Sequence, residues 1–369
     1  MGQRFLRRIR AASRRIRMAR VIARGLQSRR HPILVQIVPT RRCNLACTYC
    51  NEFDKVSAPV PLDTMLARID HLAALGTSMI DLSGGEPLLH PETEEIVRRI
   101  RSHGMLAGLL TNGYLLTRER IQKLNRAGLD RLQISIDNVT PDDVSHKSLK
   151  VLDQKLRWLA ELAAFDVSIN TVLGTGVGQN DDALVIAQRA LSFGFGTSVG
   201  VIHDGSGQTA PLDSRQRELY RQLQGLGRSF YSHAHDRLFQ ENLVRGVANE
   251  WRCGAGARYL YVCEDGLAHW CSQQRGHPGI PLERYTVDDL DREYDTVKSC
   301  APLCTVSCVH RVALLDAIRE RPLETLERLS AADRAVGGQT PRTVKVLTRV
   351  FVTSPRRDLF RRLALRALR

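Results

Sequence analysis

The sequence lacks the long apolar segments of a membrane protein and the apolar block of a secretory signal. No apolar run in the 369 residues approaches the ~20 residues that a membrane-spanning helix needs. The basic N-terminus leads into no continuous apolar block, which excludes a signal peptide. A myristoylation motif is also missing, because Leu6 stands where Ser or Thr is required. These absences predict a cytoplasmic protein, and a hydrophobic content of 43% allows a sizeable core.

A disulfide framework is missing as well, although the chain has nine cysteines. Three of them lie close together at Cys43, Cys47 and Cys50, and the next cysteine is Cys253. The remaining cysteines fall between residues 253 and 308. A group of three and a group of six suit metal clusters better than paired disulfides, and they indicate a reducing compartment.

The first cysteine group has the spacing C-x3-C-x2-C and follows directly after the apolar segment 33–38. Iron–sulfur clusters usually take four cysteine ligands, so a loop of three leaves one iron open to an outside ligand. A zinc site or a redox-active disulfide is the alternative interpretation. No His or fourth Cys follows in the loop to close a zinc site. The pattern therefore favours an open-site cluster, which indicates chemistry rather than storage.

Short apolar segments alternate with helical patterns from residue 31 onward. The predicted strands are 33–38, 79–83, 106–110, 132–136, 167–173 and 198–203. The predicted helices between them are 62–75, 92–103, 117–127, 149–164 and 181–193. Six successive β-α units predict a parallel sheet with right-handed crossovers. Six units rather than eight indicate an open, partial TIM-like (β/α)6 barrel, with the active site at the C-terminal ends of its strands.

Unusual residues stand at the ends of these strands. The second strand ends in Ser83-Gly84-Gly85-Glu86-Pro87, where paired glycines let the backbone approach a ligand closely. The third strand ends in Thr111-Asn112-Gly113, the fourth in Ser135-Ile136-Asp137, and the fifth carries Asn170. Each motif alone is typical of a turn. Their order at successive strand ends is specific.

Together with Tyr49 just before the last cysteine of the loop, these motifs resemble the radical S-adenosylmethionine (radical SAM) enzymes over about residues 31–204. The resemblance implies a 4Fe-4S cluster whose open iron is chelated by S-adenosylmethionine. It further implies reductive cleavage to a 5'-deoxyadenosyl radical that attacks a substrate, with flavodoxin or ferredoxin as reductant. The cluster ligands implied are Cys43, Cys47 and Cys50. The cofactor-binding residues implied are Tyr49, Gly84, Gly85, Glu86, Pro87, Asn112, Ser135, Asp137 and Asn170.

The sixth predicted strand ends at His203 and Asp204. A His-Asp pair at such a strand end is a candidate acid or base facing the substrate. A loop pair that satisfies its own hydrogen bonds is the alternative.

The second cysteine group begins before a predicted hairpin, in which residues 259–263 and 267–271 flank the turn Glu264-Asp265-Gly266. Its opening, Cys253-x12-Gly266-x4-Cys271, resembles the SPASM and twitch auxiliary-cluster domains of radical SAM enzymes. The later spacing departs from the full SPASM pattern, so the resemblance implies one auxiliary 4Fe-4S cluster, as in the twitch variant. Its ligands would be Cys253, Cys271 and two of Cys300, Cys304 and Cys308. Cys263 is interpreted as structural, and a four-cysteine zinc site is the rival for the whole group.

The net charge of +15 is concentrated at the two ends of the chain. Residues 1–30 contain eleven Arg and no acidic residue, and residues 341–369 contain eight Arg, one Lys and one Asp. An amphipathic helix is predicted at each end. The N-terminal apolar stripe consists of Phe5, Ile9, Ala12, Ile16, Ala19, Ala23 and Leu26. The C-terminal stripe consists of Leu359, Phe360, Leu363, Ala364 and Ala367.

Basic helices of this kind fit the surface of an anionic membrane, which favours peripheral attachment on its inner face. Docking of both helices on the mildly acidic body of the protein is the alternative, and nucleic acid is disfavoured as a partner. The predicted organisation has five parts: a basic helix, the barrel, a helical connector, the auxiliary-cluster domain and C-terminal helices with a basic tail. Their bounds are 1–30, 31–210, 211–250, 251–312 and 313–369.

The substrate is not encoded in a recognisable motif. Only about 30 residues precede the first strand, so we expect no peptide-recognition domain before the barrel. With basic segments at both ends, this favours a small molecule or a membrane-associated lipid or isoprenoid precursor as substrate. A peptide- or protein-modifying maturase is the alternative, and a non-catalytic iron–sulfur electron-transfer protein is the second. No cobalamin-binding module is recognisable, which disfavours cobalamin-dependent methyl transfer.

Overall fold

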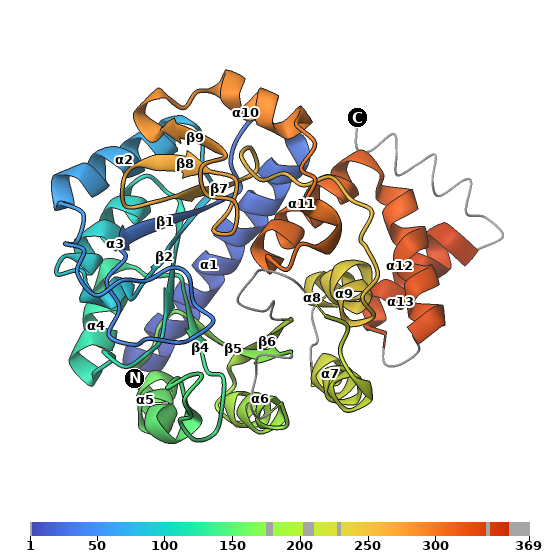
Figure 1. Ribbon diagram of the computed structural model, residues 1–369, viewed down its shortest axis with the longest axis horizontal. Helices are drawn as coiled ribbons and strands as arrows, with labels where there is room; N and C mark the ends of the chain where they lie inside the picture. The colour runs from blue at the N-terminus through green and yellow to red at the C-terminus, as the bar shows by residue number, and fades with distance from the viewer. Residues whose placement is uncertain (1, 175–179, 202–209, 227–229, 337–339, 354–369) are drawn as a thin grey trace.

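The computed structural model describes residues 2–174, 180–201, 210–226, 230–336 and 340–353, with side chains from Ile9 onward (Figure 1). In this part of the chain nine strands form one sheet in the order β6-β5-β4-β3-β2-β1-β7-β8-β9. The strands are β1 (Leu34–Thr40), β2 (Met79–Gly84), β3 (Leu106–Thr111), β4 (Arg131–Ser135), β5 (Asp166–Leu173), β6 (Gly196–Val201), β7 (Tyr259–Val262), β8 (Leu267–His269) and β9 (Pro278–Pro281).

Strands β1 to β6 are parallel, and each pairs with the next strand along the chain. The helices between them pack against one face of the sheet, where Ile69, Ile80 and Leu109 belong to a fully buried core. These helices are α2 (Leu62–Ala74), α3 (Thr93–Ser102), α4 (Arg118–Ala127), α5 (Leu149–Leu162) and α6 (Asp182–Ser192). The prediction of an open, partial barrel is confirmed, with strand bounds within a few residues of those expected.

The predicted hairpin does not stand apart from the barrel. Strand β7 pairs in parallel with β1, with Leu34 opposite Tyr259 and Ile37 opposite Val262. Strands β8 and β9 follow in antiparallel pairing. The cysteine-rich region therefore continues the same sheet on the far side of β1, which the sequence pattern did not indicate.

The C-terminal half is mainly helical (Figure 1). Its helices are α7 (Ser214–Leu226), α8 (Phe230–His235), α9 (Glu241–Val244), α10 (Val287–Asp295), α11 (Ser307–Glu320), α12 (Pro322–Val336) and α13 (Arg342–Thr348). A π-turn over Asp236–Gln240 joins α8 to α9. Helix α11 packs Val309, Val312 and Leu315 against the inner face of the sheet, in one cluster with Leu34 and Tyr259.

Helix α1 (Gly2–Gln27) crosses the N-terminal ends of the strands. Its Met18 and Val21 pack on a cluster that contains Leu34, Met79 and Leu106, near or at the starts of β1, β2 and β3. The predicted N-terminal helix is present. Five members of its predicted apolar stripe, Ile9, Ala12, Ile16, Ala19 and Ala23, are exposed, whereas Leu26 packs on the same cluster as Met18 and Val21. The predicted C-terminal stripe lies outside the described residues. None of the described helices is both long and apolar enough to cross a membrane.

Candidate functional site

The three cysteines of the first group line one cavity. Cys43, Cys47 and Cys50 follow β1, and they border a cavity of about 240 Å³ together with Gly84 and Gly85 at the end of β2. The turn between the last two cysteines is closed by a hydrogen bond from the Cys50 N–H to the Cys47 carbonyl at 3.1 Å. All three are free thiols. The site therefore offers three convergent sulfur donors beside exposed backbone.

Glycine is required where β2 meets the cysteine loop. A Cβ atom on Gly85 would lie 2.3 Å from the Arg41 carbonyl and 2.4 Å from the Arg42 carbonyl, so a larger residue would push the two segments apart. Gly84 has a φ of +107°, which L-residues rarely adopt. The paired glycines thus bring the end of β2 against the start of the cysteine loop.

Glu86 connects the end of β2 to the end of β3 through hydrogen bonds. Neither Glu86 nor Pro87 lines the cavity. Its carboxylate is fully buried and accepts hydrogen bonds from the Thr111 hydroxyl at 2.7 Å and the Asn112 N–H at 2.8 Å. Burial raises the pKa of Glu86, and those donors together with the Leu88 N–H oppose the rise. The residue holds β3 in register with β2 rather than facing a ligand.

Asn112 and Ser135 line the cavity from the ends of β3 and β4. The Asn112 side-chain amide donates to the Asn44 side chain at 2.7 Å and lies 3.8 Å from the Cys43 sulfur. Asn170 lies on β5 beside Ser135, but it is not among the cavity residues. Its side-chain amide oxygen accepts a hydrogen bond from the Ser198 hydroxyl at 2.8 Å.

Asp137 is the centre of a buried network beneath the cysteine loop. Its carboxylate accepts hydrogen bonds from the Tyr49 hydroxyl and from Ser145 at 2.7 Å, and it pairs with Lys147 at 3.1 Å. The Ser145 hydroxyl also lies 3.5 Å from the Cys47 sulfur. The loop between β4 and α5 therefore contacts the cysteine loop and holds it in position.

Lys147 lines the cavity and was missed from the sequence. Burial opposes its charge, but the Asp137 carboxylate and Tyr49 outweigh burial, so the pKa of Lys147 lies well above its usual value. The ammonium group is thus a permanent positive charge at the cavity wall. A basic residue in a loop that follows a strand end was the available signal. His203 and Asp204 lie outside the described residues.

Four cysteines of the second group act on one another electrostatically. Burial raises the pKa of Cys271 to about 12, and Cys253 and Cys300 contribute to the rise. Burial also raises the pKa of Cys304, to which Cys271, Cys253 and Cys300 add. The thiols that the structure brings together are Cys253, Cys271, Cys300 and Cys304.

Cys308 has a different set of polar neighbours. It stands in the first turn of α11, where its sulfur accepts a hydrogen bond from the Gln36 side chain of β1 at 3.6 Å. Its charged neighbours are Asp81 and Arg131 of the barrel interior, and Arg311. Among the three cysteines that the sequence left open, Cys300 and Cys304 are coupled electrostatically to Cys271 and Cys253, and Cys308 is not among the main causes of the pKa shifts of Cys271 and Cys304.

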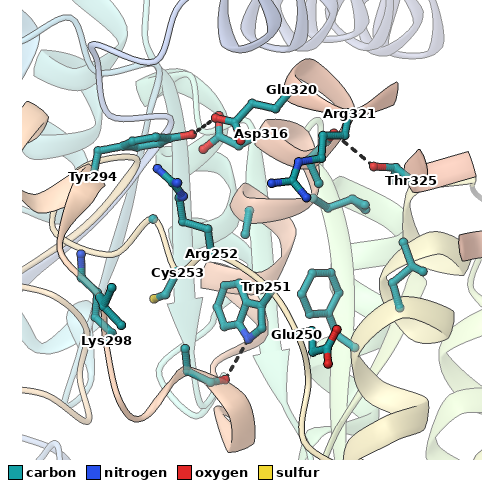
Figure 2. Close-up of a pocket in the computed structure, with 18 of the residues that line it drawn as sticks. Glu250, Trp251, Arg252, Cys253, Tyr294, Lys298, Asp316, Glu320, Arg321 and Thr325 are labelled. Carbon is teal, nitrogen blue, oxygen red and sulfur yellow. Dashed lines mark hydrogen bonds between the residues drawn. The ribbon is translucent and has the colours of Figure 1, made fainter. Parts of the chain in front are cut away.

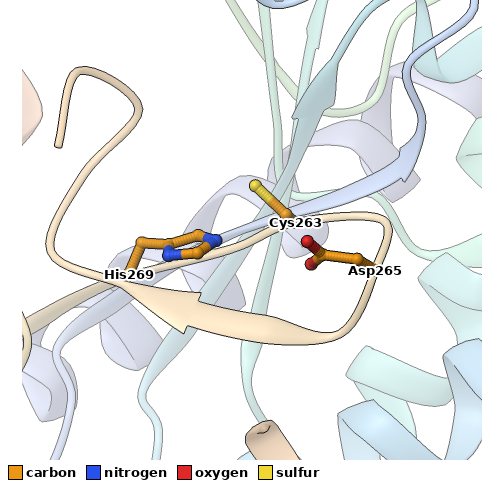
Figure 3. Close-up of side chains that lie close together, drawn as sticks. All are labelled: Cys263, Asp265 and His269. Atoms are coloured by element: carbon orange, nitrogen blue, oxygen red, sulfur yellow. The ribbon is translucent and has the colours of Figure 1, made fainter. Parts of the chain in front are cut away.

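Cys263 lies on the hairpin beside Asp265 and His269, and one ligand atom of each lies within 4.8 Å of the others (Figure 3). The His269 Nδ1 atom accepts a hydrogen bond from the Gly276 N–H at 3.0 Å, so the neutral ring carries its proton on Nε2. Asp265 accepts from the Leu267 N–H at 2.9 Å. These hydrogen bonds occupy polar atoms of His269 and Asp265 and stabilise the hairpin. The three residues are therefore not a preformed metal site.

A second cavity, of about 450 Å³, lies beside Cys253 (Figure 2). Cys253 and Lys298 line one side of it, and Asp316 and Glu320 of α11 line another. The Trp251 indole donates to the Ala301 carbonyl at 2.8 Å and fixes the loop that carries Cys253. The cavity therefore borders the second cysteine group at Cys253.

The half-barrel with a three-cysteine loop at its strand ends defines a class of enzyme. Residues 37–187 match the family model described as the radical SAM superfamily. These residues therefore form a radical SAM domain, as the sequence motifs implied. Enzymes of that superfamily use a 4Fe-4S cluster and S-adenosylmethionine. Three convergent thiols, open backbone at Gly84 and Gly85 and the adjoining cavity fit both groups.

Two curated relatives match parts of the chain. The PqqA peptide cyclase of Gluconobacter oxydans is 36% identical over 104 residues, which is 27% of this chain and 29% of that protein. The GTP 3',8-cyclase of Limosilactobacillus fermentum is 36% identical over 166 residues, which is 41% of this chain and 48% of that protein. The matches thus span less than half of each relative.

A solved structure shares the fold over more of the chain. Streptococcus suis SuiB bound to the precursor peptide SuiA gives a TM-score of 0.53 at 13% identity, over 82% of this chain and 77% of that chain. The similarity therefore extends beyond the radical SAM domain.

Proposed function

We propose that this protein binds S-adenosylmethionine at a 4Fe-4S cluster held by Cys43, Cys47 and Cys50 and modifies a peptide or protein substrate. When bound, the cluster supplies one electron that splits S-adenosylmethionine into methionine and a 5'-deoxyadenosyl radical. The observation that carries the proposal is the single cavity that the three thiols share with Gly84 and Gly85.

The residues around that cavity would bind and orient the cofactor. Exposed backbone at Gly84 and Gly85 suits an amino group or carboxylate, and Asn112 and Ser135 offer side-chain hydrogen bonds at the next two strand ends. The Lys147 ammonium lies on the same wall, where it favours a carboxylate or the negative charge of a cluster. Glu86 and Asp137 act indirectly, because they hold the strand ends and the cysteine loop in position.

A second 4Fe-4S cluster on Cys253, Cys271, Cys300 and Cys304 is part of the proposal. Cys253 and Cys300 help to raise the pKa values of Cys271 and Cys304, so the four thiols form a site whose charge is relieved when a metal cluster takes up the thiolates. A zinc ion with four cysteine ligands is the competing occupant. The second cavity beside Cys253 would leave room there for a reductant's approach, with flavodoxin or ferredoxin as the proposed electron donors.

A peptide substrate is supported by two comparisons. One relative is named as a peptide cyclase, and the SuiB structure that shares the fold contains a precursor peptide. The lipid or isoprenoid substrate expected from the basic termini finds no support among these relatives. The basic termini instead support peripheral attachment of the protein to an anionic membrane surface, which is a proposal about location rather than chemistry.

Anaerobic reconstitution with iron and sulfide tests the chemistry. We expect about eight irons per chain for two clusters, about four in the Cys43, Cys47, Cys50→Ala triple variant, and 5'-deoxyadenosine from the wild type alone after adding dithionite and S-adenosylmethionine. The Cys263→Ala variant is the matched control and should keep all the iron. A loaded core cluster whose spectrum does not respond to S-adenosylmethionine would refute the proposal.

The substrate class is tested with cell extract divided into an aqueous peptide fraction, the same fraction after protease digestion, and a solvent-extracted lipid fraction. Each is added to the reconstituted enzyme, and 5'-deoxyadenosine is counted. Stimulation by the peptide fraction that protease abolishes is the expected result. Stimulation confined to the lipid fraction would restore the lipid hypothesis.

A further inference from the structure

The outer face of α1 is apolar even though the helix is docked on the protein. Ile9 and Ile16 are 49% and 56% exposed, and Ala12, Ala19 and Ala23 are exposed as well. Their spacing of three and four residues places all five on one side of the helix. We call these five residues the α1 stripe. It is a continuous apolar strip that runs along most of the described part of α1.

The stripe faces outward because arginines hold the inner face. The Arg14 side chain donates to the Asp166 carboxylate at 2.7 Å and to the Ala164 carbonyl at 3.0 Å. Arg17 pairs with the buried carboxylate of Asp130. Docking therefore uses a mixed face, on which these arginines accompany Met18 and Val21, and the α1 stripe is left without a partner among the described residues.

Arginines also border the α1 stripe. Arg15 and Arg20 are exposed on its two sides, and neither forms an ion pair with any residue that the structure describes. Residues 1–30 carry eleven Arg and no acidic residue. An apolar strip with cationic borders complements a surface of acyl chains beneath anionic headgroups. We infer that the α1 stripe docks on an anionic bilayer, with Ile9 and Ile16 inserted and Arg15 and Arg20 at the phosphates.

This docking fixes which way the active site faces. Helix α1 contacts Asp166, the first residue of β5, and Asp130, directly before β4. The cysteine loop and Gly84 lie at the opposite ends of the strands. Seven residues of β1 separate the two levels by roughly 20 Å. A bilayer on the α1 stripe therefore leaves the cavity of the three cysteines open to water, and the substrate arrives from that side.

The inference rests on the proposed membrane attachment and is independent of the proposed chemistry. Cosedimentation of the full-length protein with vesicles tests it, using phosphatidylcholine vesicles with and without phosphatidylglycerol. We expect binding to the anionic vesicles only, weakened at least about tenfold by Ile9→Asp with Ile16→Asp. The matched control is Val151→Asp with Val185→Asp, two exposed valines of α5 and α6, which should bind like the wild type.

Insertion is tested separately with a variant that keeps the stripe apolar. Tryptophan fluorescence of Ile16→Trp should be quenched by brominated acyl chains in anionic vesicles, whereas the added tryptophan of Val185→Trp should not be quenched. Binding to vesicles that is unchanged by the Asp pair and leaves Ile16→Trp unquenched would overturn the assignment of the stripe but keep the attachment. No binding to either vesicle would overturn both.

Two other occupants of the stripe have distinct outcomes. If a second copy of the chain covers it, light scattering without lipid gives a dimer that Ile9→Asp with Ile16→Asp converts to monomer. If nucleic acid is the partner, a duplex DNA probe competes with the vesicles, and Arg15→Gln with Arg20→Gln abolishes its binding while the Asp pair does not. Either result would overturn the bilayer inference.

Discussion

Arg131 of β4 reaches across β3 to the carboxylate of Asp81 on β2, and the pair crosses directly over Gly108. Its Nε donates to Asp81 at 3.0 Å, and its second guanidinium nitrogen also bonds the same carboxylate. A Cβ atom on Gly108 would lie 1.9 Å from the Asp81 oxygen. Arg131 and Asp81 can thus form an ion pair across β3 because Gly108, which lies between them, has no side chain.

Gly108→Ala is expected to break that pair and to leave Asp81, which is 1% exposed, without its cation. Loss of one member of a buried pair typically costs 3–5 kcal/mol, and partial exposure of Arg131 reduces this to roughly 2–3 kcal/mol. The free energy of unfolding in urea measures it. Gly225→Ala in α7, where the new Cβ meets nothing within 4 Å, is the control and should be neutral or slightly stabilising. An equal loss in both variants would contradict the explanation.

Variants that lack different cysteines of the second group should differ in their iron content. Cys304→Ala is expected to lose about four irons after reconstitution, because it removes one of the four grouped thiols. Cys308→Ala is expected to keep them, because its sulfur contacts Gln36 instead. Iron counting of the two variants side by side decides the matter. Iron loss on removing Cys308 and retention on removing Cys304 would reverse the assignment.

Lys147→Met is expected to destabilise the protein because it leaves the buried Asp137 carboxylate without its cation. The expected loss is on the order of 3 kcal/mol, seen as a lower urea midpoint. The cysteine loop should loosen at the same time, since Tyr49 shares the network. Lys150→Met, at an exposed position three residues on, is the control. If Lys147→Met behaves like that control, Asp137 does not depend on this ion pair.

The protein is expected to lose stability at acid pH because of His31. Burial and then the neighbouring Arg258 and Arg24 lower the pKa of His31 to about 3, so the folded protein keeps the ring neutral. Between about pH 6.5 and 3 the unfolded chain binds a proton that the folded chain does not, so stability falls as pH falls through this window. The slope is at most ~1.4 kcal/mol per pH unit.

The measurement is the urea midpoint at pH 7.5, 6.5 and 5.5 for the wild type and His31→Gln. The variant should lose less stability than the wild type between pH 6.5 and 5.5. Parallel curves would show that another group carries the pH dependence.

The sequence was sufficient for the barrel and for the core cysteine loop because both are local signals. Alternation of apolar segments gives the strands, and Cys43, Cys47 and Cys50 lie within eight residues. Lys147 could not be found in this way, because its partner Tyr49 is 98 residues away and the pair forms only when the strand ends meet.

Two other predictions located residues in the sequence but did not specify which way their side chains face. The N-terminal periodicity showed that Ile9 and Ile16 share a face but not whether that face is buried, because Arg14 and Arg17 could equally have faced water. The spacing of Cys300, Cys304 and Cys308 likewise could not show that the third turns toward β1. Both outcomes depend on contacts between segments far apart in sequence.

The pairing of β7 with β1 has a practical consequence for dissecting the protein. One edge of β1 bonds to β2, which carries the paired glycines, and the other edge bonds to β7. A truncated chain ending before Tyr259 would expose the β7-facing edge of a strand whose residues are all buried, and such bare edges recruit other chains into aggregates. The segments that carry the two cysteine groups are thus joined through β1. Neither segment is a natural unit to express alone.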